Sequence, residues 1–479
     1  MSTKWKTTAS LVFILALSFS VRGLTAYFIH THFSDPGWFQ SGTYALFDRQ
    51  AQNILDHKAS PFWIEDPSRT EPAIYPPGYS IWLALIYSLT GSRSPETVQK
   101  VQVVLDSFSI LLVVVIAMTA FSYRAGLAAG ILASLSPLLS LHGAIPLADA
   151  PTSWLVVAAV LLVLIVVKNQ GANSSSAITP ERSTVRPAKM STLICVALAG
   201  LMLGLSCWLR SNAVLLPVFW IGAIWFLKTP TRYRVLFSSA LLIGFLVAIS
   251  PLVIRNAVAF HVLSPTGLGV GTNLWEGIGE TDRAAEFGAV YGDSSLVEKE
   301  RAELGVTSDQ RFELYYPDGV KRDRERTRKA LTVIFANPVW YAGVMLRRMA
   351  SVLKFAGEPG HFYGSSGINV TSEKCLPERL RGGFTGLVVK VLGMAQSVCR
   401  YLALPLMLVG VALALRINWR LALLLLGTII YYLVVGSGLH TEFRYGLPMQ
   451  ALLFVFAGLT LDWLMGGLRT RTLPNFNLS

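Results

Sequence analysis

The sequence has few charged residues for its length. Only 14% of its 479 residues are Asp, Glu, Lys or Arg, whereas 53% are hydrophobic. A soluble domain of this size needs a more highly charged surface, so the composition excludes an ordinary soluble protein. The hydrophobic residues also gather in runs of about 20 residues, the length that crosses the hydrocarbon core of a bilayer. The sequence therefore predicts an all-α polytopic membrane protein.

Cysteine is scarce as well, and the four cysteines form no CxxC or other metal-ligand spacing. HExxH and clustered histidines are missing too, so no metal site and no cofactor are predicted, and a divalent-metal requirement stays open. Cys195 and Cys207 lie in an apolar run, which is typical of packing residues. Cys375 and Cys399 can pair only if both face an oxidising compartment, which the sequence does not decide.

The formal net charge of +13 does not indicate nucleic-acid binding. The Lys and Arg residues lie in short loops between apolar runs, where they set membrane topology. The first apolar run, Thr8–Ile29, is longer than a signal-peptide core and has no A-x-A cleavage site. We expect it to be a retained anchor, and we expect no nucleic-acid partner.

About ten apolar runs are the predicted membrane spans. They are Thr8–Ile29, Val98–Phe121, Gly126–His142, Thr152–Val167, Leu193–Leu209, Val214–Leu227, Val235–Ile254, Tyr401–Leu415, Leu421–Val435 and Leu447–Met465. Two other segments are ambiguous. Pro77–Gly91 is short for a span, and Pro338–Phe355 carries Arg347, Arg348 and Lys354, which is typical of an amphipathic interfacial helix.

The distribution of charge predicts the topology. If Pro77–Gly91 does not span, the Lys and Arg clusters between spans fall on the side of Lys4 and Lys6, which the positive-inside rule places in the cytoplasm. Most acidic residues then lie outside. Both termini are predicted to be cytoplasmic, in a plasma (inner) membrane protein. The expected parts are an N-terminal module (1–256), a large extracytoplasmic loop region with amphipathic helices (257–400) and C-terminal spans (401–479).

The first outer loop holds a candidate catalytic carboxylate. Residues 44–55 (YALFDRQAQNIL) read as a short amphipathic helix that carries Asp48, and Tyr75-Pro76-Pro77 marks a sharp turn back toward the membrane. A carboxylate at this boundary can act as a general base. The simpler interpretation is a solvated helix face, with Asp48 beside Arg49.

Other candidates lie at the outer ends of the spans. Asp149 is either an N-cap for the helix at Thr152 or a second carboxylate facing the same cavity. Arg210 and Arg255 each end a span, and Arg255 precedes Asn256. These arginines can bind a phosphate, or can extend to lipid headgroups.

Three further features carry polar groups. Gly267–Gly277 lacks a P-loop Lys-Ser/Thr, so it predicts a flexible loop over a ligand, or a plain turn, rather than a nucleotide site. In the last short loop His440, Glu442 and Arg444 are costly unless paired, and a Glu442–Arg444 pair is the simple explanation. Asp106 is a buried-carboxylate candidate with Lys100 as a possible partner.

Several motifs then occur in a characteristic order. After Asp48 they are YPPGYSIWLALIYSLTG (75–91), LADAP (147–151), WLRSNAVLLP (208–217), SPLVIRNAVAFH (250–261), GTNLWEG (271–277) and HTEFRYGLP (440–448). Their order and predicted side resemble the integral-membrane GT-C glycosyltransferases, especially the bacterial branch related to protein mannosyltransferases and lipid A aminoarabinose transferases. The resemblance covers most of the chain.

The resemblance implies a GT-C-like bundle of about ten transmembrane helices, with extracytoplasmic loops and juxtamembrane helices. It implies transfer of a hexose or pentose from a polyprenyl-phosphate carrier to a lipid, glycan or protein acceptor outside. An acidic residue of the first outer loop is the base, here Asp48 or Asp35, and basic residues hold the carrier phosphate, here Arg210, Arg255 and Arg444. Many relatives have the loop Asp near the position of Thr43, which puts Asp48 in doubt.

The implied chemistry agrees with the residue types. A membrane-edge arginine can stabilise the phosphate that leaves, and a carboxylate can deprotonate an acceptor hydroxyl. Direct displacement inverts the anomeric carbon. The alternative is a lipid or sugar transporter or flippase without chemistry, which needs ionisable groups deep in the membrane, and a structural scaffold is the third class.

Overall fold

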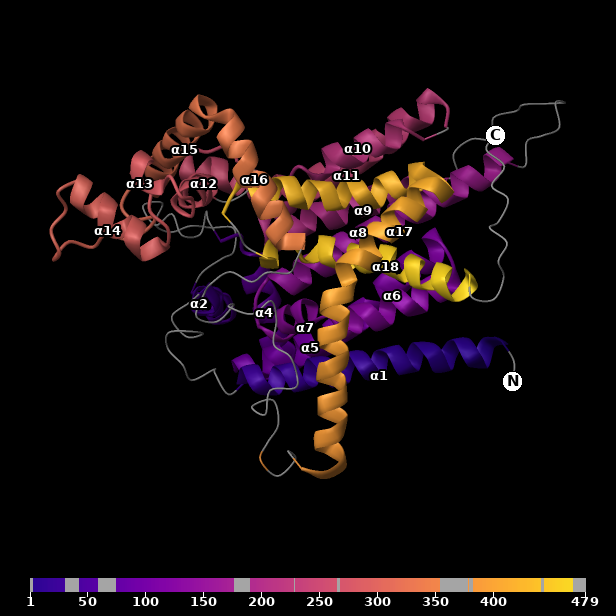
Figure 1. Ribbon diagram of the computed structural model, residues 1–479. Coiled ribbons are helices and arrows are strands. Elements are labelled where there is room, and N and C mark those ends of the chain that lie inside the picture. Colours follow the sequence, from indigo (N-terminus) through magenta and orange to yellow (C-terminus); the bar gives the residue numbers. More distant parts are fainter. Residues whose placement is uncertain are drawn as a thin grey trace.

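The computed structural model describes residues 3–30, 43–58, 75–175, 190–227, 229–264, 268–353, 378, 382–440 and 443–467. These residues are mostly helical, and within them the only β-type pairing is an isolated bridge between Glu313 and Tyr316. Most of the long helices lie side by side in a bundle, whereas the first part of the helix that begins at Gly383, drawn in orange, runs across the others (Figure 1). The long helices are α1 (Thr3–His30), α5 (Pro95–Ala120), α6 (Tyr123–Leu135), α8 (Asp149–Ser175), α9 (Met190–Leu209), α11 (Thr231–Phe260), α17 (Gly383–Gly438) and α18 (Leu447–Gly467).

Seven of the described helices are long and apolar enough to cross a membrane, or nine if each of two bent pairs is one span. One bent pair is α6 with α7 (Pro137–Ala144), which covers most of the predicted run Gly126–His142. The predicted all-α polytopic fold is confirmed. The number is below ten partly because α10 (Leu216–Trp225) is short and because two predicted spans lie in α17.

Helix α17 contains a break at Asn418, where the backbone leaves helical geometry. After the break the helix runs antiparallel to α10, because the Arg420 guanidinium donates to the carbonyl of Phe226 while Trp220 donates to Thr428 farther along. Before the break, α17 begins at Gly383 rather than at the expected Tyr401, since the apolar pattern continues upstream. The two halves of α17 correspond to the predicted spans Tyr401–Leu415 and Leu421–Val435.

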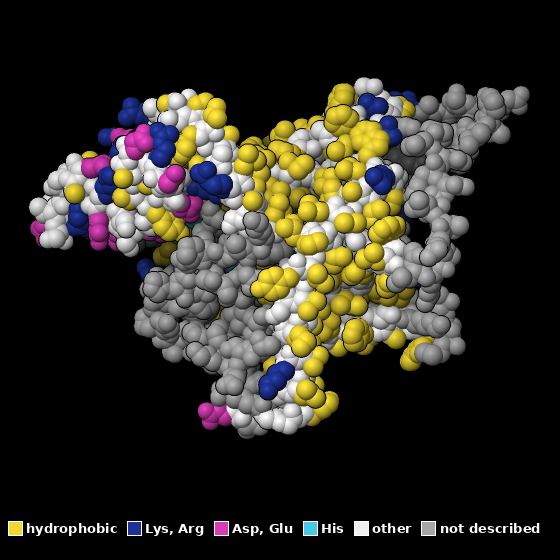
Figure 2. Space-filling model, in the orientation of Figure 1, with side chains coloured by type: hydrophobic (Ala, Val, Ile, Leu, Met, Phe, Trp, Pro, Cys, Tyr) yellow, Lys and Arg dark blue, Asp and Glu magenta, His cyan; other side chains and the backbone are white. Residues whose placement is uncertain are grey.

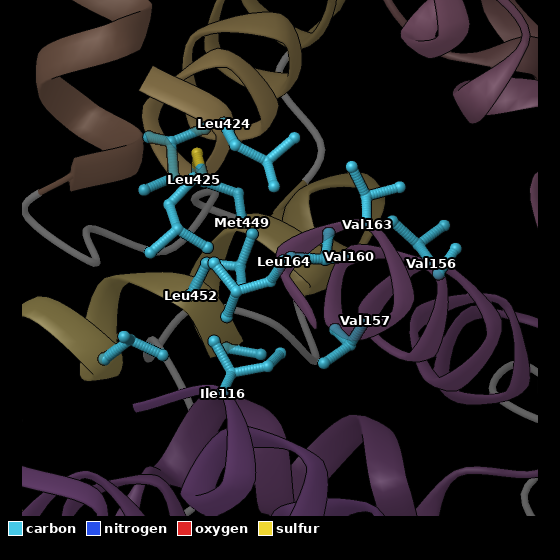
Figure 3. Packing of buried hydrophobic residues seen from close by; sticks show 14 of the residues in the cluster. Ile116, Val156, Val157, Val160, Val163, Leu164, Leu424, Leu425, Met449 and Leu452 are labelled. Atoms are coloured by element: carbon cyan, nitrogen blue, oxygen red, sulfur yellow. The ribbon is translucent and has the colours of Figure 1, made fainter. Parts of the chain in front are cut away.

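Close backbone contact ties α9 to α11. A Cβ atom added at Gly200 would lie 2.0 Å from the carbonyl oxygen of Leu241, and one added at Gly244 would lie 2.0 Å from that of Ala197. Small residues at such a crossing let transmembrane helices pack backbone to backbone. Larger apolar side chains fill the rest of the bundle, and Figure 3 shows Ile116, Leu164, Leu425 and Leu452 converging from α5, α8, α17 and α18.

A second group of helices covers one end of the bundle, and we call it the head. It comprises α12 (Val270–Gly279), α13 (Ala284–Phe287), α14 (Asp293–Glu303), α15 (Gly319–Ala336) and α16 (Pro338–Leu353). Charged side chains gather over the head, whereas the visible face of the bundle is mostly hydrophobic (Figure 2). Helices α2 (Thr43–Leu55) and α4 (Gly78–Thr90) lie at the same end, and α1 begins and α18 ends at the opposite one (Figure 1).

The head is held by its own ion pairs and by the bundle. Glu300 of α14 accepts from Arg322 and Arg326 of α15 at 2.5 and 2.7 Å. Arg348 of α16 is buried and donates to the backbone carbonyl of Ser437 at 3.1 Å, whereas its neighbour Arg347 is exposed. The expectation of an interfacial helix over Pro338–Phe355 therefore holds for Arg347 but not for Arg348, because α16 turns that face toward the end of α17.

Candidate functional site

An ion pair lies where the bundle meets the head. Asp149 begins α8 and Arg210 follows α9, and their side chains meet at two points, 2.7 Å from Nε to Oδ1 and 3.1 Å from Nη2 to Oδ2. The Asp149 side chain is only 1% exposed, and the Arg210 side chain is 17% exposed. The ion pair and its one hydrogen bond, from Nη2 to Oδ2, fix the position of the guanidinium group. The Asp149 carboxylate thus binds Arg210. This ion pair accounts for the position of the side chain without an N-cap hydrogen bond.

The last short loop packs against this pair. The guanidinium groups of Arg210 and Arg444 lie over the ring of Tyr445, with 5.1 and 5.4 Å to its centroid. The ring of His440 meets the same tyrosine edge-on at 6.0 Å. Asn212, two residues after Arg210, donates to the carbonyl of Tyr445 at 3.0 Å. The motifs 208–217 and 440–448 are therefore neighbours in space.

Tyr75 brings the third motif to the same place. Burial raises the pKa of its hydroxyl, and the charge of Asp293 raises it further, while Arg210 and Arg444 lower it. These influences mean that Asp293 of the head, Arg210 and Arg444 all lie near Tyr75. The ring of Phe47, from α2, packs edge-on against Tyr75 at 5.6 Å. We call the surroundings of Asp149, Arg210, Arg444, Tyr445 and Tyr75 the junction site.

The head adds a second carboxyl group that the sequence did not single out. Glu276 lies in α12 and is buried; burial raises its pKa to about 8, and a hydrogen bond and charge from Asp293 add to the effect. Glu280, one turn later, pairs with Arg348 at 3.1 Å and lies 3.9 Å from His440. The head therefore presents acidic groups toward a junction that the bundle lines with arginines.

The expected flexible loop or turn at Gly267–Gly277 is wrong. From Val270 onward this segment is helix α12. Its glycines serve close packing, since a Cβ at Gly271 would lie 2.0 Å from the carbonyl oxygen of Asp323, and one at Gly277 would lie 2.7 Å from that of Leu439. The glycines of this segment therefore indicate close helix contacts rather than mobility. The sequence signal that could have identified Glu276 is a single acidic residue in an otherwise apolar helix.

Comparison with known proteins bears on the fold. No protein-family model matches the sequence, and no curated protein matches it. The apo oligosaccharyltransferase of Archaeoglobus fulgidus is similar in structure, with 14% identity, a TM-score of 0.50, and 100% of this chain and 53% of that chain covered. The same enzyme tethered to an acceptor peptide gives 13% identity, a TM-score of 0.50, and 98% and 50% coverage. The chain therefore shares the fold of this oligosaccharyltransferase.

The chain spans about half the length of that oligosaccharyltransferase. ArnT from Cupriavidus metallidurans bound to undecaprenyl phosphate is a more distant match, with 12% identity, a TM-score of 0.37, and 98% of this chain and 79% of that chain covered. The likeness to the oligosaccharyltransferase confirms the expected GT-C-like bundle. At 13% and 14% identity, this likeness shows the fold but assigns no role to any residue.

Asp48 follows Phe47, which packs against Tyr75 of the junction site, and the hydrogen bonds of its carboxylate are made within α2 and to α4. Its carboxylate accepts from the hydroxyl of Tyr87 at 2.5 Å and from the side-chain amide of Gln52 at 2.9 Å. Tyr44 in turn contacts Tyr87, with 3.0 Å between the two hydroxyl oxygens. Asp48 is half-buried in a hydrogen-bonded network rather than a solvated partner of Arg49. Its role as a base stays a prediction.

Arg255 lies at the head end of α11 and is buried with Asn256. Its guanidinium donates to the Asn256 side-chain oxygen from Nε at 3.1 Å and from Nη2 at 2.9 Å. Asn256 then donates to the carbonyl of Ser264 at 3.2 Å, which ties the helix to the following loop. The two hydrogen bonds from Arg255 to Asn256 thus orient its guanidinium group.

The expected Lys100 partner of Asp106 is wrong. Asp106 accepts from Arg22 Nε at 2.5 Å and from the indole of Trp154 at 2.7 Å, which ties α5 to α1 and α8 inside the bundle. Lys100 is exposed and stands six residues away, a spacing that does not bring side chains together on a helix. The true partner belongs to another helix, so spacing along α5 could not reveal it.

Some predicted residues lie outside the described part of the chain, namely Asp35, Glu442 and Cys375. Cys399 is buried and its thiol donates to the carbonyl of Leu132 at 3.5 Å. No group of three or more His, Cys, Asp or Glu side chains suited to a metal ion occurs among the described residues.

Proposed function

We propose that this protein is a membrane glycosyltransferase that moves a hexose or pentose from a polyprenyl-phosphate carrier to a lipid, glycan or protein acceptor. The observation that carries the proposal is the junction site, where Asp149, Arg210 and Arg444 surround Tyr445 at one end of a GT-C bundle. One similar structure holds a tethered acceptor peptide. The proposal that the donor is a lipid carrier is supported by the order of the sequence motifs and by these arginines.

In this proposal arginines bind the donor phosphate. Arg210 and Arg444 both lie over the ring of Tyr445, and Arg255 lies in the last part of the neighbouring helix α11. A sugar phosphate gains negative charge as it leaves, and fixed guanidinium groups stabilise that charge at little reorganisation cost. The isoprenoid tail would follow the apolar helices away from the head.

A carboxylate takes the proton of the acceptor hydroxyl. Asp48 is our first choice, with Asp35 and Asp149 as alternatives. The Tyr87 and Gln52 hydrogen bonds orient the Asp48 carboxylate, whereas Asp149 is already paired with Arg210. The hydroxyl oxygen forms a bond to the anomeric carbon, the bond to the phosphate oxygen breaks, and the configuration inverts. No metal-dependent step is required of the residues named.

The head side is proposed to be extracytoplasmic, with both termini in the cytoplasm of a plasma membrane protein. The positive-inside pattern supports this orientation. Single cysteines introduced between Ala289 and Leu304 should react with an impermeant thiol reagent added outside, and cysteines between Gly171 and Thr184 should not. Reversed labelling would overturn the orientation.

The function is tested with purified protein in vesicles and a sugar linked to undecaprenyl phosphate. The expected result is release of undecaprenyl phosphate together with a glycosylated acceptor from an envelope extract. A transporter would move the lipid-linked sugar across the bilayer and release no carrier. That outcome would replace the transferase proposal.

A further inference from the structure

A cavity of about 670 Å³ lies between the head end of α11 and the start of α15. Its lining includes Val258 and Phe260 from α11, and Lys321, Arg324 and Arg328 from α15. This volume is typical of a pocket for a small molecule or a lipid headgroup. No residue of the junction site lines it, so the cavity is a separate feature.

Helix α15 has two different basic faces. Arg322 and Arg326 point into the head, where both pair with Glu300. Lys321, Arg324 and Arg328 follow the i, i+3, i+7 pattern of the opposite face and are exposed at the cavity. No ion pair joins these three to any residue that the structure describes.

The lining also contains two carboxylates, Asp318 and Glu325, together with His261. The three cations outnumber them, so the cavity is net positive with neutral histidine. Arginine side chains can bind a phosphate oxygen pair in a fork, and lysine supplies a point charge. The chemistry of the lining therefore favours an anion of the phosphate type.

An apolar stripe leads from the bundle into the cavity. Ile243, Val247, Ile254 and Val258 recur at i, i+4, i+11 and i+15 on one face of α11, and each is at least 60% exposed. Helix α11 is a candidate membrane span, so this face meets acyl chains. Arg255 is buried and lies on a different face. The ligand that matches both features has an anionic head and aliphatic chains.

We infer that this cavity binds an anionic lipid from the leaflet nearest the head. The headgroup phosphate lies on Lys321, Arg324 and Arg328, and the chains follow the stripe on α11. The inference does not depend on the transferase proposal, because neither the junction site nor a sugar donor enters it. In this inference the exposed face of α11 contacts the lipid chains, and a different face carries Arg255.

The test compares matched double variants of the full-length protein. Arg324→Gln/Arg328→Gln removes two charges from the cavity, and Lys299→Gln/Lys329→Gln removes two from the head elsewhere. Lys329 pairs with Glu303 instead of lining the cavity. Each protein is reconstituted with phosphatidylglycerol and phosphatidylcholine, and retained lipid is counted by native mass spectrometry. A spin-labelled lipid gives relative affinity.

Wild type should prefer phosphatidylglycerol, and the cavity variant should lose about tenfold or more of that preference, since each basic residue near a membrane surface contributes on the order of fivefold. The control variant should keep it. Equal loss in both variants, or retention in the cavity variant, would overturn the site. Glycerol phosphate has the headgroup without chains, so binding as tight as the lipid's would also overturn it.

Discussion

Two Asp–Arg pairs in the described part of the bundle differ in what surrounds them, namely Arg22–Asp106 and Arg210–Asp149. Arg22–Asp106 is closed, because the arginine also donates to Ser18, the carboxylate also accepts from Trp154, and the side chains are 1% and 9% exposed. Arg210–Asp149 has its arginine 17% exposed. The first pair is enclosed by other side chains of the protein, whereas the second leaves its arginine partly exposed.

Crowding around the first pair supports this distinction. A Cβ atom added at Gly143 would lie 2.1 Å from the Asp106 carboxylate oxygen. The cavity beside Arg22 and Asp106 has a volume of only about 20 Å³, which is room for little more than a water molecule. Around the second pair, Arg444 and Tyr445 add a further cation and an aromatic face. The same two residue types thus hold helices together in one place and are suited to a ligand in another.

The largest effect is expected from breaking the closed pair. Asp106→Asn leaves Arg22 charged and without its carboxylate inside the bundle, which should cost about 3–5 kcal/mol. The measurement is the thermal midpoint and folded yield in detergent. Asp149→Asn is the matched control and should lose less stability, because water reaches Arg210. Equal midpoints for Asp106→Asn and wild type would refute a structural role for the closed pair.

The next effect concerns the base near the junction. Asp48→Asn preserves shape but removes the proton acceptor, so sugar transfer should fall by at least about a hundredfold while folding persists. Asp35→Asn is the comparison variant and should have a smaller effect. Loss of transfer only in Asp35→Asn would move the assignment to that residue. If neither variant changes transfer, Asp149 becomes the next carboxylate to test.

Carrier binding should respond to Arg255. Arg255→Ala removes a charge-assisted contact, so affinity for undecaprenyl phosphate should fall by about 10- to 100-fold. Arg255→Lys should recover only part, because a point charge replaces a fork. The readout is retained carrier in native mass spectrometry, and exposed Arg347→Ala is the control. Equal affinity in all four proteins would remove Arg255 from the phosphate site.

The smallest effect is a pH dependence in the head. The folded pKa of Glu276, about 8, lies above the ordinary value of 4.5, so folding favours the protonated form. Its contribution to stability is fully present below about pH 4.5 and is lost as the pH rises through about 8. The thermal midpoint should therefore fall over that window, and Glu276→Gln should flatten the curve. An unchanged slope in the variant would assign the dependence to other groups.

Sequence reasoning succeeded where the signal was local. The apolar runs predict the bundle helices, and the amphipathic pattern at 44–55 predicts α2. The motifs that hold Asp149, Arg210 and Arg444 do converge in space. Each of these residues ends or begins a helix at the same end of the bundle, and topology alone brings such positions together.

It failed where a contact depends on tertiary packing. Arg22 and Asp106 are far apart in the chain and meet only because α1 packs against α5. Glu276 and Asp293 belong to different head helices, and no spacing rule pairs them. Glycines suggested a loop at 267–277, but Gly271 and Gly277 lie in α12, where the backbones of Asp323 and Leu439 approach them closely.

The glycine crossing of α9 and α11 has a geometric consequence for the arginines. Arg210 stands ten residues beyond Gly200, and Arg255 stands eleven beyond Gly244, on helices that run in the same direction. At about 1.5 Å per residue, each arginine lies roughly 15 Å from the crossing. The contact at Gly200 and Gly244 therefore sets how far apart α9 and α11 lie, and with it the backbone positions of Arg210 and Arg255. In the phosphate site that we propose, a bulkier side chain at Gly200 or Gly244 would push α9 and α11 apart and change the spacing of Arg210 and Arg255.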